Sequence, residues 1–232
     1  MSTGILYIVA TPIGNLGDLT FRALETLKKA DLIVCEDTRN TKKLLDKYAI
    51  ATPLACFYKK GGKGAIKPGL ASEFVIANLR NGKNVALVTD AGTPGISDPG
   101  NLLVEKAIEN QIPVIPIPGA SALTALASVS GIDLSKFVFL GFPPHKKGRM
   151  TFIADIFKSN YPVIIYESKY RILKLLKELS GYSGEKRINL IIGRELTKMY
   201  EEIIKGDVET VIKYFLENKQ KNLGEFTVII YK

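Results

Sequence analysis

Short apolar runs alternate with amphipathic stretches along the first half of the chain. β-branched and other apolar residues predict strands at 5–10, 31–35, 85–88, 113–117 and 137–141. Between them, apolar residues recur at helical spacing over residues 20–29, 42–48, 70–79, 101–108 and 122–128. In the first predicted helix Thr20 is the cap, and Phe21, Leu24 and Leu27 form the apolar stripe. Strands that alternate with helices favour a mainly parallel sheet covered on both faces.

The alternation restarts after a break in the middle of the chain. Further helices are predicted at 152–157, 173–179 and 208–216, and further strands at 162–166, 189–193, 203–204 and 226–231. The break, Phe142-Pro-Pro-His-Lys-Lys-Gly148, carries two prolines and no periodicity, which is typical of a linker. The pattern therefore predicts two α/β domains, residues 1–141 and 149–232, joined by a linker at 142–148.

Composition narrows the class of protein. Of the 232 residues, 46% are hydrophobic, and no apolar stretch approaches the roughly 20 residues of a membrane span. The amino terminus enters a predicted strand without a basic segment, so we expect no signal peptide. Cys35 and Cys56 are the only cysteines, and without a neighbouring histidine they predict no metal site. We expect a cytoplasmic protein without a metal or a membrane partner.

The formal charge of +9 indicates an anionic partner, and nucleic acid is the commonest one. A lysine-rich surface that only faces water is the alternative. Two basic clusters lie on segments with glycine and no periodicity, from which they could reach a phosphate backbone. The predicted RNA-binding residues are Lys59, Lys60, Lys63, His145, Lys146, Lys147 and Arg149.

Several common kinds of catalysis find no support in the sequence. The chain has no Gly-x-x-x-x-Gly-Lys-Ser/Thr phosphate loop, and no Gly-x-Gly-x-x-Gly follows its first predicted strand. His145 is the only histidine and lies in the predicted linker, which argues against Ser-His-Asp and Cys-His catalysis. Phosphoryl transfer, hydride transfer and nucleophilic hydrolysis are therefore disfavoured.

Four loops rich in glycine, proline and small polar residues follow predicted strands, at residues 11–18, 36–39, 90–100 and 118–122. The carboxyl ends of parallel strands meet at one edge of a sheet, where open α/β folds bind ligands. We therefore expect these loops to line one cleft. Asp90 could hold ribose hydroxyls or balance a cation, although an Asx turn or a helix cap is the alternative for this carboxylate.

The loops belong to a series of motifs that spans nearly the whole chain. They are Leu6-Tyr-Ile-Val-Ala-Thr-Pro-Ile-Gly-Asn-Leu-Gly-Asp-Leu-Thr20, Glu36-Asp-Thr-Arg39, Asp90-Ala-Gly-Thr-Pro-Gly-Ile-Ser-Asp-Pro-Gly100, Pro118-Gly-Ala-Ser121, Gly141-Phe-Pro-Pro144, Tyr166-Glu-Ser168, Arg194-Glu-Leu-Thr-Lys198 and Gly224-Glu-Phe226. In this order they resemble the tetrapyrrole-methylase superfamily of S-adenosylmethionine-dependent methyltransferases. Within it they are similar to the bacterial branch that 2′-O-methylates a cytidine of 16S ribosomal RNA.

The resemblance implies two α/β domains with the methyl donor S-adenosylmethionine in the cleft between them, a homodimer, and 16S rRNA or the 30S subunit as the partner. The donor contacts it predicts are Pro12, Asp90, Ala91, Gly92, Thr93, Ile96, Ser121, Ala122, Tyr166, Leu196 and Gly224. The chain also departs from the family pattern. Ala120 replaces a proline, Gly95 replaces a bulkier residue, and a lysine-glycine segment at 57–67 replaces a shorter stretch that contains histidine.

Methyl transfer to a ribose hydroxyl requires alignment of oxygen, methyl and sulfur, and removal of a proton. The candidates for the base are Asp37 and Glu36, followed by Asp18 and Glu195. The candidates for orienting the hydroxyl or its phosphate are Arg39, Arg194 and Lys198. Each could instead form a salt bridge across the domain interface. Methylation of a corrin or porphyrin, and RNA binding without catalysis, are the alternative functions.

Overall fold

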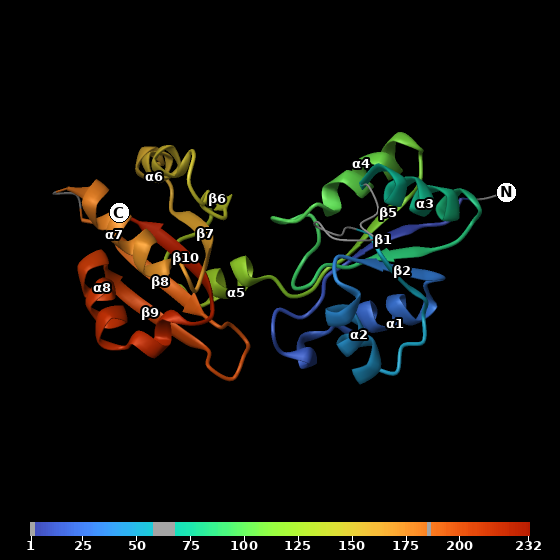
Figure 1. The fold of residues 1–232 in the computed structure, drawn as a ribbon, viewed down its shortest axis with the longest axis horizontal. Helices are drawn as coiled ribbons and strands as arrows, with labels where there is room; N and C mark the ends of the chain where they lie inside the picture. Colours follow the sequence, from blue (N-terminus) through green and yellow to red (C-terminus); the bar gives the residue numbers. More distant parts are fainter. Residues whose placement is uncertain (1–2, 58–67, 185–186) are drawn as a thin grey trace. The chain divides into compact units, whose positions relative to one another are not determined.

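The chain forms two compact units, unit 1 (Met1–Ser121) and unit 2 (Ala122–Lys232), and each has its own sheet and helices (Figure 1). The computed structural model describes residues 3–57, 68–184 and 187–232. Both units are α/β, as the alternation of apolar runs and amphipathic stretches predicts.

Unit 1 is built on a parallel five-stranded sheet with the strand order β3-β2-β4-β1-β5. Its strands are β1 (Leu6–Val9), β2 (Leu32–Cys35), β3 (Leu54–Cys56), β4 (Val85–Leu87) and β5 (Val114–Ile117). In register, Leu6 of β1 lies between Val85 and Val114. Because these strands are parallel, the loops after β1, β2, β4 and β5 all begin at the same edge of the sheet.

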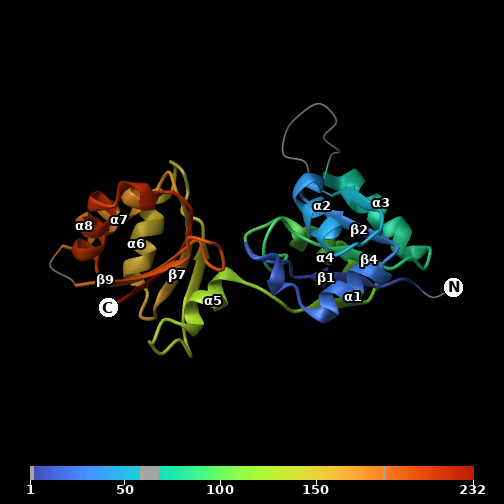
Figure 2. The ribbon, with the colours of Figure 1, turned by 90° about the horizontal axis from the view of Figure 1, so that it is seen from below.

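Helices cover both faces of this sheet (Figures 1 and 2). They are α1 (Phe21–Lys29), α2 (Thr38–Lys47), α3 (Pro68–Arg80) and α4 (Gly100–Glu109), with a short 3₁₀ turn, η1 (Leu16–Asp18), before α1. Successive residues of a strand point to opposite faces. Ile33 therefore packs with Leu27 of α1 in one core, whereas Val34 packs with Leu79 of α3 and Leu103 of α4 in the other.

Unit 2 contains a mixed sheet with the strand order β6-β7-β10-β8-β9. Its strands are β6 (Val138–Gly141), β7 (Val163–Ser168), β8 (Asn189–Arg194), β9 (Glu202–Asp207) and β10 (Glu225–Tyr231). β6 and β7 are parallel, and the other pairs are antiparallel. β10 is central, with Val228 opposite both Ile165 and Ile192.

Three helices share a core with one face of the second sheet: α6 (Arg149–Lys158), α7 (Ile172–Ser183) and α8 (Val208–Glu217). The short helix α5 (Ala122–Ser128) contacts β10, and Leu126 of α5 is fully buried. Gly193 of β8 makes this close packing possible, since a Cβ there would lie 2.9 Å from Leu126 Cδ1. A 3₁₀ turn, η2 (Lys219–Asn222), precedes β10.

The predicted boundary near residue 141 is wrong, because the structure divides between Ser121 and Ala122. The strand predicted at 137–141 falls in the predicted first domain, but as β6 it pairs with β7 in the second sheet. The segment 142–148 therefore connects β6 to α6 inside unit 2 and does not link the units. Its prolines mark a loop, which the pattern of apolar residues alone does not distinguish from an interdomain linker.

Two local predictions have different outcomes. Thr20 caps α1 as expected, since its side chain accepts a hydrogen bond from Ala23 N at 3.1 Å. Phe21 does not belong to the apolar stripe: it is 89% exposed, and Ala23 lies in the core beside Leu27 instead. The short strand β3 was not predicted, because only three residues, Leu54–Cys56, form it at the edge of the sheet.

Candidate functional site

Hydrogen bonds join three of the four predicted loops of unit 1. Thr11 N donates to Gly92 O at 2.9 Å and Gly92 N donates to Thr11 O at 3.1 Å, so the loop after β1 pairs with the loop after β4. Thr93 Oγ1 donates to Ala120 O at 3.2 Å, which connects the loop after β4 to the loop after β5. The expected convergence at one edge of this sheet is therefore present for these loops.

Within the acidic loop after β4, the two carboxylates have different roles. Asp98 accepts hydrogen bonds from Gly95 N at 2.8 Å and Gly100 N at 2.7 Å, so its carboxylate shapes the loop and the start of α4. Asp90 is exposed and, within the described ranges, forms no ion pair within 4 Å. Asp98 thus makes an Asx turn of the kind considered for Asp90, one residue before the N-cap Pro99, and Asp90 faces solvent.

The loop after β2 places Asp37 at the start of α2. Asp37 accepts a hydrogen bond from Arg39 N at 2.8 Å and another from Arg39 Nε at 3.0 Å. These hydrogen bonds lower the pKa of Asp37 to about 2. The pKa of the Arg39 guanidinium is raised, first by Asp37 and in smaller part by the charge of Asp90. A carboxylate that caps a helix and pairs with a guanidinium is a weak proton acceptor at neutral pH.

The remaining predicted residues of unit 1 differ in exposure. Pro12 is buried, Glu36 and Ser121 are half-buried, and Ala91 and Ile96 are exposed. Asp18 lies in η1, where its Oδ2 is buried without a hydrogen-bond partner among the described residues.

Cys35 at the end of β2 is buried, and burial chiefly raises the pKa of its thiol to about 11. This thiol is a core group and no ready nucleophile.

In unit 2, Glu195 joins the segment that follows β8 to the first residue of β10. Glu195 N donates to Glu225 O at 2.9 Å, and Glu195 Oε1 accepts from Glu225 N at 2.7 Å and from Lys198 Nζ at 3.1 Å. Burial by itself raises the pKa of Glu195, but these hydrogen bonds outweigh it and the net pKa is lowered. Gly224 has φ +122°, and a Cβ there would lie 2.6 Å from Glu195 Cγ, so only glycine fits.

Arg194 holds backbone in place and, among the described residues, forms no ion pair within 4 Å. Its guanidinium donates from Nε to Lys221 O at 3.0 Å and to Leu223 O at 2.9 Å, and from Nη1 to Tyr200 O at 2.9 Å. Leu196 is buried and packs closely on Gly193. The side chain predicted to orient a substrate is thus used to fix the loops around the end of β8. Ala122 and Tyr166, two further predicted donor contacts, are half-buried, at the start of α5 and on β7.

Arg149, which the sequence grouped with the basic surface, is buried. Its side chain is 4% exposed and lies 3.3 Å from Glu167 and 2.7 Å from Glu178, and Arg171 binds Glu167 from the other side at 3.0 Å. Arg149 is therefore not available to RNA, because its charge is paired inside unit 2. The sequence places Glu167 only in the Tyr-Glu-Ser motif. Of its two arginine partners, Arg171 lies four residues later, whereas Arg149 lies 18 residues earlier, a contact that spacing does not reveal.

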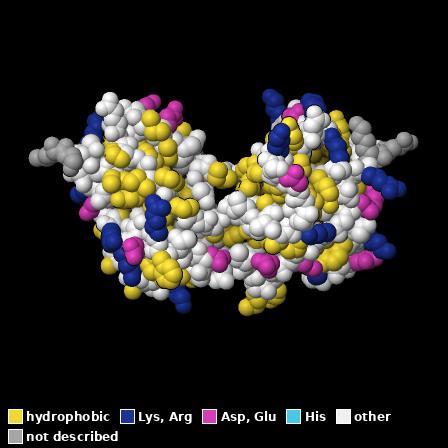
Figure 3. All heavy atoms as spheres, turned by 180° about the vertical axis from the view of Figure 1, so that it is seen from behind, with side chains coloured by type: hydrophobic (Ala, Val, Ile, Leu, Met, Phe, Trp, Pro, Cys, Tyr) yellow, Lys and Arg dark blue, Asp and Glu magenta, His cyan; other side chains and the backbone are white. Residues whose placement is uncertain are grey.

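The other predicted basic residues fall into two groups. His145, Lys146 and Lys147 are exposed. Lys59, Lys60 and Lys63 lie outside the described residues. On the face drawn in Figure 3, lysine and arginine side chains are scattered over both units without one dominant basic patch.

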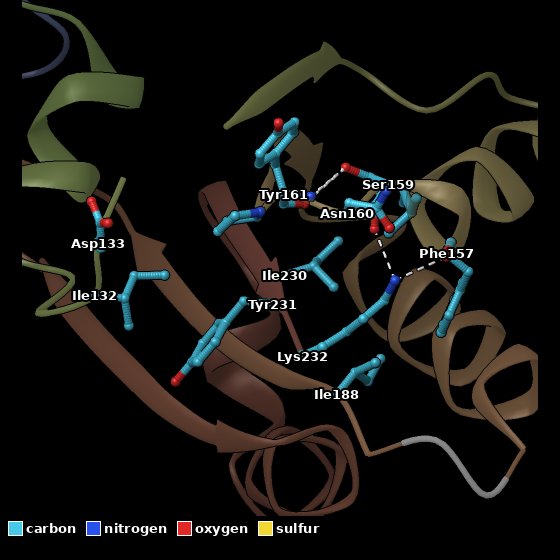
Figure 4. A pocket seen from close by; sticks show the side chains of 12 residues that line it. Ile132, Asp133, Phe157, Ser159, Asn160, Tyr161, Ile188, Ile230, Tyr231 and Lys232 are labelled. Atoms are coloured by element: carbon cyan, nitrogen blue, oxygen red, sulfur yellow. Dashed lines mark hydrogen bonds between the residues drawn. The ribbon is translucent and has the colours of Figure 1, made fainter. Parts of the chain in front are cut away.

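A pocket of about 200 Å³ opens in unit 2 among the end of α6, the start of β7 and the end of β10 (Figure 4). Lys232 Nζ lies beside it and donates to Phe157 O at 3.1 Å and Ser159 O at 2.8 Å. None of the predicted site residues lines this pocket. Tyr166 and Gly224 lie toward the opposite ends of β7 and β10, so this pocket is separate from the predicted donor contacts.

Among the described residues, no helix is long and apolar enough to cross a membrane. The same residues contain no cluster of three or more histidine, cysteine, aspartate or glutamate side chains able to hold a metal ion.

Comparison with known proteins decides the family. Residues 5–212 match the family described as Tetrapyrrole (Corrin/Porphyrin) Methylases. The chain belongs to the tetrapyrrole methylase family. It is 46% identical over 228 residues to Ribosomal RNA small subunit methyltransferase I of Synechocystis sp., a match that covers 98% of this chain and 78% of that protein. It is 44% identical over 227 residues to the protein of that name from Thermotoga maritima, covering 98% of both chains.

Solved structures confirm the predicted α/β fold class of the family. The chain is similar to cobalt precorrin-4 methyltransferase, a cobalamin biosynthetic enzyme, with a TM-score of 0.69 over 97% of this chain and 94% of that one. It is also similar to uroporphyrin III C-methyl transferase from Thermus thermophilus, with a TM-score of 0.63 over 97% of each. Both are 16% identical to this chain, so they establish the fold alone.

Proposed function

We propose that this chain transfers a methyl group from S-adenosylmethionine to the ribose 2′-oxygen of a cytidine in 16S rRNA. The observation that carries the proposal is its identity of 46% and 44%, over 98% of its length, to two proteins named Ribosomal RNA small subunit methyltransferase I. The fold does not choose the acceptor, because the similar solved structures are named for a precorrin and a uroporphyrin.

The loop after β4 fits a donor that carries an adenine, a ribose and a cationic sulfur. Asp90 is exposed, and its carboxylate can accept hydrogen bonds from ribose hydroxyls. A Cβ on Gly95 would meet no atom within 4 Å, and the neighbouring Ile96 is 45% exposed, so open space adjoins an apolar side chain. When bound, the donor supplies the methyl group on its sulfonium sulfur.

The reaction forms a methyl–oxygen bond, breaks the methyl–sulfur bond and releases the hydroxyl proton. The chain must align the reacting atoms and accept that proton. Asp37 and Glu195 are poor acceptors, because hydrogen bonds lower the pKa of both carboxyls. We assign Asp37 and Arg39 to positioning the loop after β2, and Lys198 to holding Glu195 in place. Glu36, next to Asp37, is the base to test first.

The test is methyl transfer from labelled S-adenosylmethionine to 30S subunits that lack the modification, followed by mapping of the labelled nucleotide. We expect label on the 2′-oxygen of one cytidine in 16S rRNA. Glu36→Gln should lower the single-turnover rate by about 10²–10⁴-fold, the usual contribution of a general base. Tight donor binding without label in RNA would instead support a corrin or porphyrin acceptor. No donor binding would refute the methyltransferase assignment.

We also propose that the protein acts in the cytoplasm as a homodimer on the 30S subunit. The resemblance to the tetrapyrrole methylases supports the dimer, and the named relatives support the ribosomal partner. Analytical ultracentrifugation tests the first point: a monomer at micromolar concentration would overturn it. Co-sedimentation with 30S subunits tests the second.

A further inference from the structure

Two segments of unit 2 that are far apart in sequence form one surface. Arg171 Nη1 donates to Pro143 O at 2.9 Å, and Arg149 Nη1 donates to Pro144 O at 3.1 Å. These bonds place the loop 142–147 beside the turn at residues 169–170 after β7. We call this surface the loop–turn patch; it consists of Phe142, His145, Lys146, Lys147, Lys169 and Tyr170.

We propose that the loop–turn patch binds a single-stranded segment of RNA. This inference rests on the proposed function and deepens it, because it names the surface that holds the acceptor chain. It extends the three basic residues predicted at 145–147 by a lysine and two aromatic side chains from outside that cluster.

The buried carboxylates beneath the patch do not neutralise its lysines. Arg149 and Arg171 face inward and are balanced by two carboxylates, Glu167 and Glu178. In the described part of the chain, no carboxylate lies within 4 Å of the ammonium groups of Lys146, Lys147 or Lys169. The nearest lysine in sequence that forms an ion pair is Lys174, with Glu178. Three ammonium groups therefore remain for an external anion such as a phosphate backbone.

Aromatic side chains accompany these lysines. Tyr170 is 83% exposed, with Lys169 Nζ 4.9 Å from its ring centroid. Phe142 is 51% exposed, and its ring is supported by Tyr166 at a centroid distance of 5.3 Å. Exposed rings interleaved with lysines are the arrangement that stacks unpaired bases while holding the backbone. A duplex hides the faces of its bases, so the patch fits single-stranded RNA better than double-stranded RNA.

The patch is also held firmly. Pro143 and Pro144 restrict the loop, and their carbonyls are fixed by guanidinium groups that share the fully buried carboxylate of Glu167. A preformed surface loses less conformational entropy on binding than a flexible loop would. Rigid support beneath lysines and aromatic rings distinguishes this patch from lysines spread along a helix.

The test measures binding of a fluorescein-labelled single-stranded RNA oligonucleotide, and of a duplex of the same sequence, by anisotropy over a range of salt concentrations. Tyr170→Ala should weaken single-strand binding by at least about fivefold through loss of one stacked base. Replacing Lys146, Lys147 and Lys169 together by Gln should reduce the slope of log K against log salt by about 2. The charge-matched control replaces Lys28, Lys43 and Lys213, and the aromatic control is Tyr182→Ala.

The outcomes separate this inference from the proposed function. Weaker RNA binding and methylation in the patch variants, with donor affinity and far-ultraviolet circular dichroism unchanged, supports the patch. Wild-type binding and methylation in those variants overturns the patch and leaves the proposed function standing. Equal weakening by the control triple, or preference for the duplex, also overturns it. A wild-type protein that binds single-stranded RNA through the patch but methylates no RNA would refute the proposed function alone.

Discussion

Replacing Glu167 by Gln removes a negative charge from the interior of unit 2. The Glu167 side chain is 0% exposed, and its oxygens lie 3.3 Å from Arg149 Nη2 and 3.0 Å from Arg171 Nε. Glutamine keeps the size of the side chain, but among the described residues it leaves Arg149, 4% exposed, with Glu178 as its acidic partner and Arg171, 15% exposed, with none within 4 Å. Breaking a buried ion pair from one side costs about 3–5 kcal/mol. We expect Glu167→Gln to lower the free energy of unfolding of unit 2 by about that amount.

Urea unfolding followed by far-ultraviolet circular dichroism measures this change, since the chain has no tryptophan for fluorescence. Hydrogen exchange read by mass spectrometry assigns the affected transition to unit 2. Glu217→Gln is the matched control: Glu217 is 62% exposed and 3.9 Å from Lys213, so its loss should cost less than about 1 kcal/mol. If Glu167→Gln costs no more than this control, the buried network does not stabilise unit 2 and the reasoning fails.

Three further predictions concern other sites. Gly224→Ala should destabilise unit 2 and weaken donor binding in calorimetry, because the new Cβ would collide with Glu195. The control Gly181→Ala places a Cβ that meets no atom within 4 Å and should stabilise α7 by about 0.5–1 kcal/mol. Equal changes in the free energy of unfolding for the two variants would contradict this reasoning. The pKa of Asp37 is lowered to about 2, so the ionised carboxylate contributes its full stabilisation above about pH 4 and loses it as the pH falls toward 2. Asp37→Asn should therefore flatten the dependence of the unfolding free energy on pH in this range. The pKa of Cys35 is raised to about 11, so in a Cys56→Ala variant iodoacetamide at pH 8 should label the native thiol far more slowly than free cysteine; rapid labelling would refute its burial.

Much of the fold follows from local patterns of apolar residues. The runs at β2 and β4 follow the pattern expected of strands buried on both faces, which are continuously apolar. The runs at β1 and at the edge strand β5 are equally apolar, although these strands are only partly buried. The pattern contains no information on which sheet a strand joins. The apolar pattern of Val138–Gly141 is compatible with a strand of the first sheet and equally with a partner of β7. Only the structure shows that it pairs with β7.

The candidate site was less predictable, because side-chain roles depend on partners that are remote in sequence. The convergence of the loops followed from parallel topology, and the Thr11–Gly92 pairing agrees with it. The basic cluster at 145–149 did not reveal that Arg149 points inward, since its carboxylate partners lie 18 and 29 residues away. Asp37 and Asp98 likewise look available in the sequence, but backbone N–H groups occupy both carboxylates.

The central place of β10 has a consequence for how the protein is made. Unit 1 can close its sheet once β5, at residues 114–117, has left the ribosome. In unit 2, β10 pairs with β7 on one side and with β8 on the other. The facing edges of β7 and β8 therefore stay unpaired until residues 225–231 emerge and insert between them. Domains generally fold in order of synthesis, so nascent unit 2 waits with two open strand edges. Open edges of this kind are templates for pairing with other chains, so we expect the nascent second sheet to be most prone to aggregation before β10 inserts.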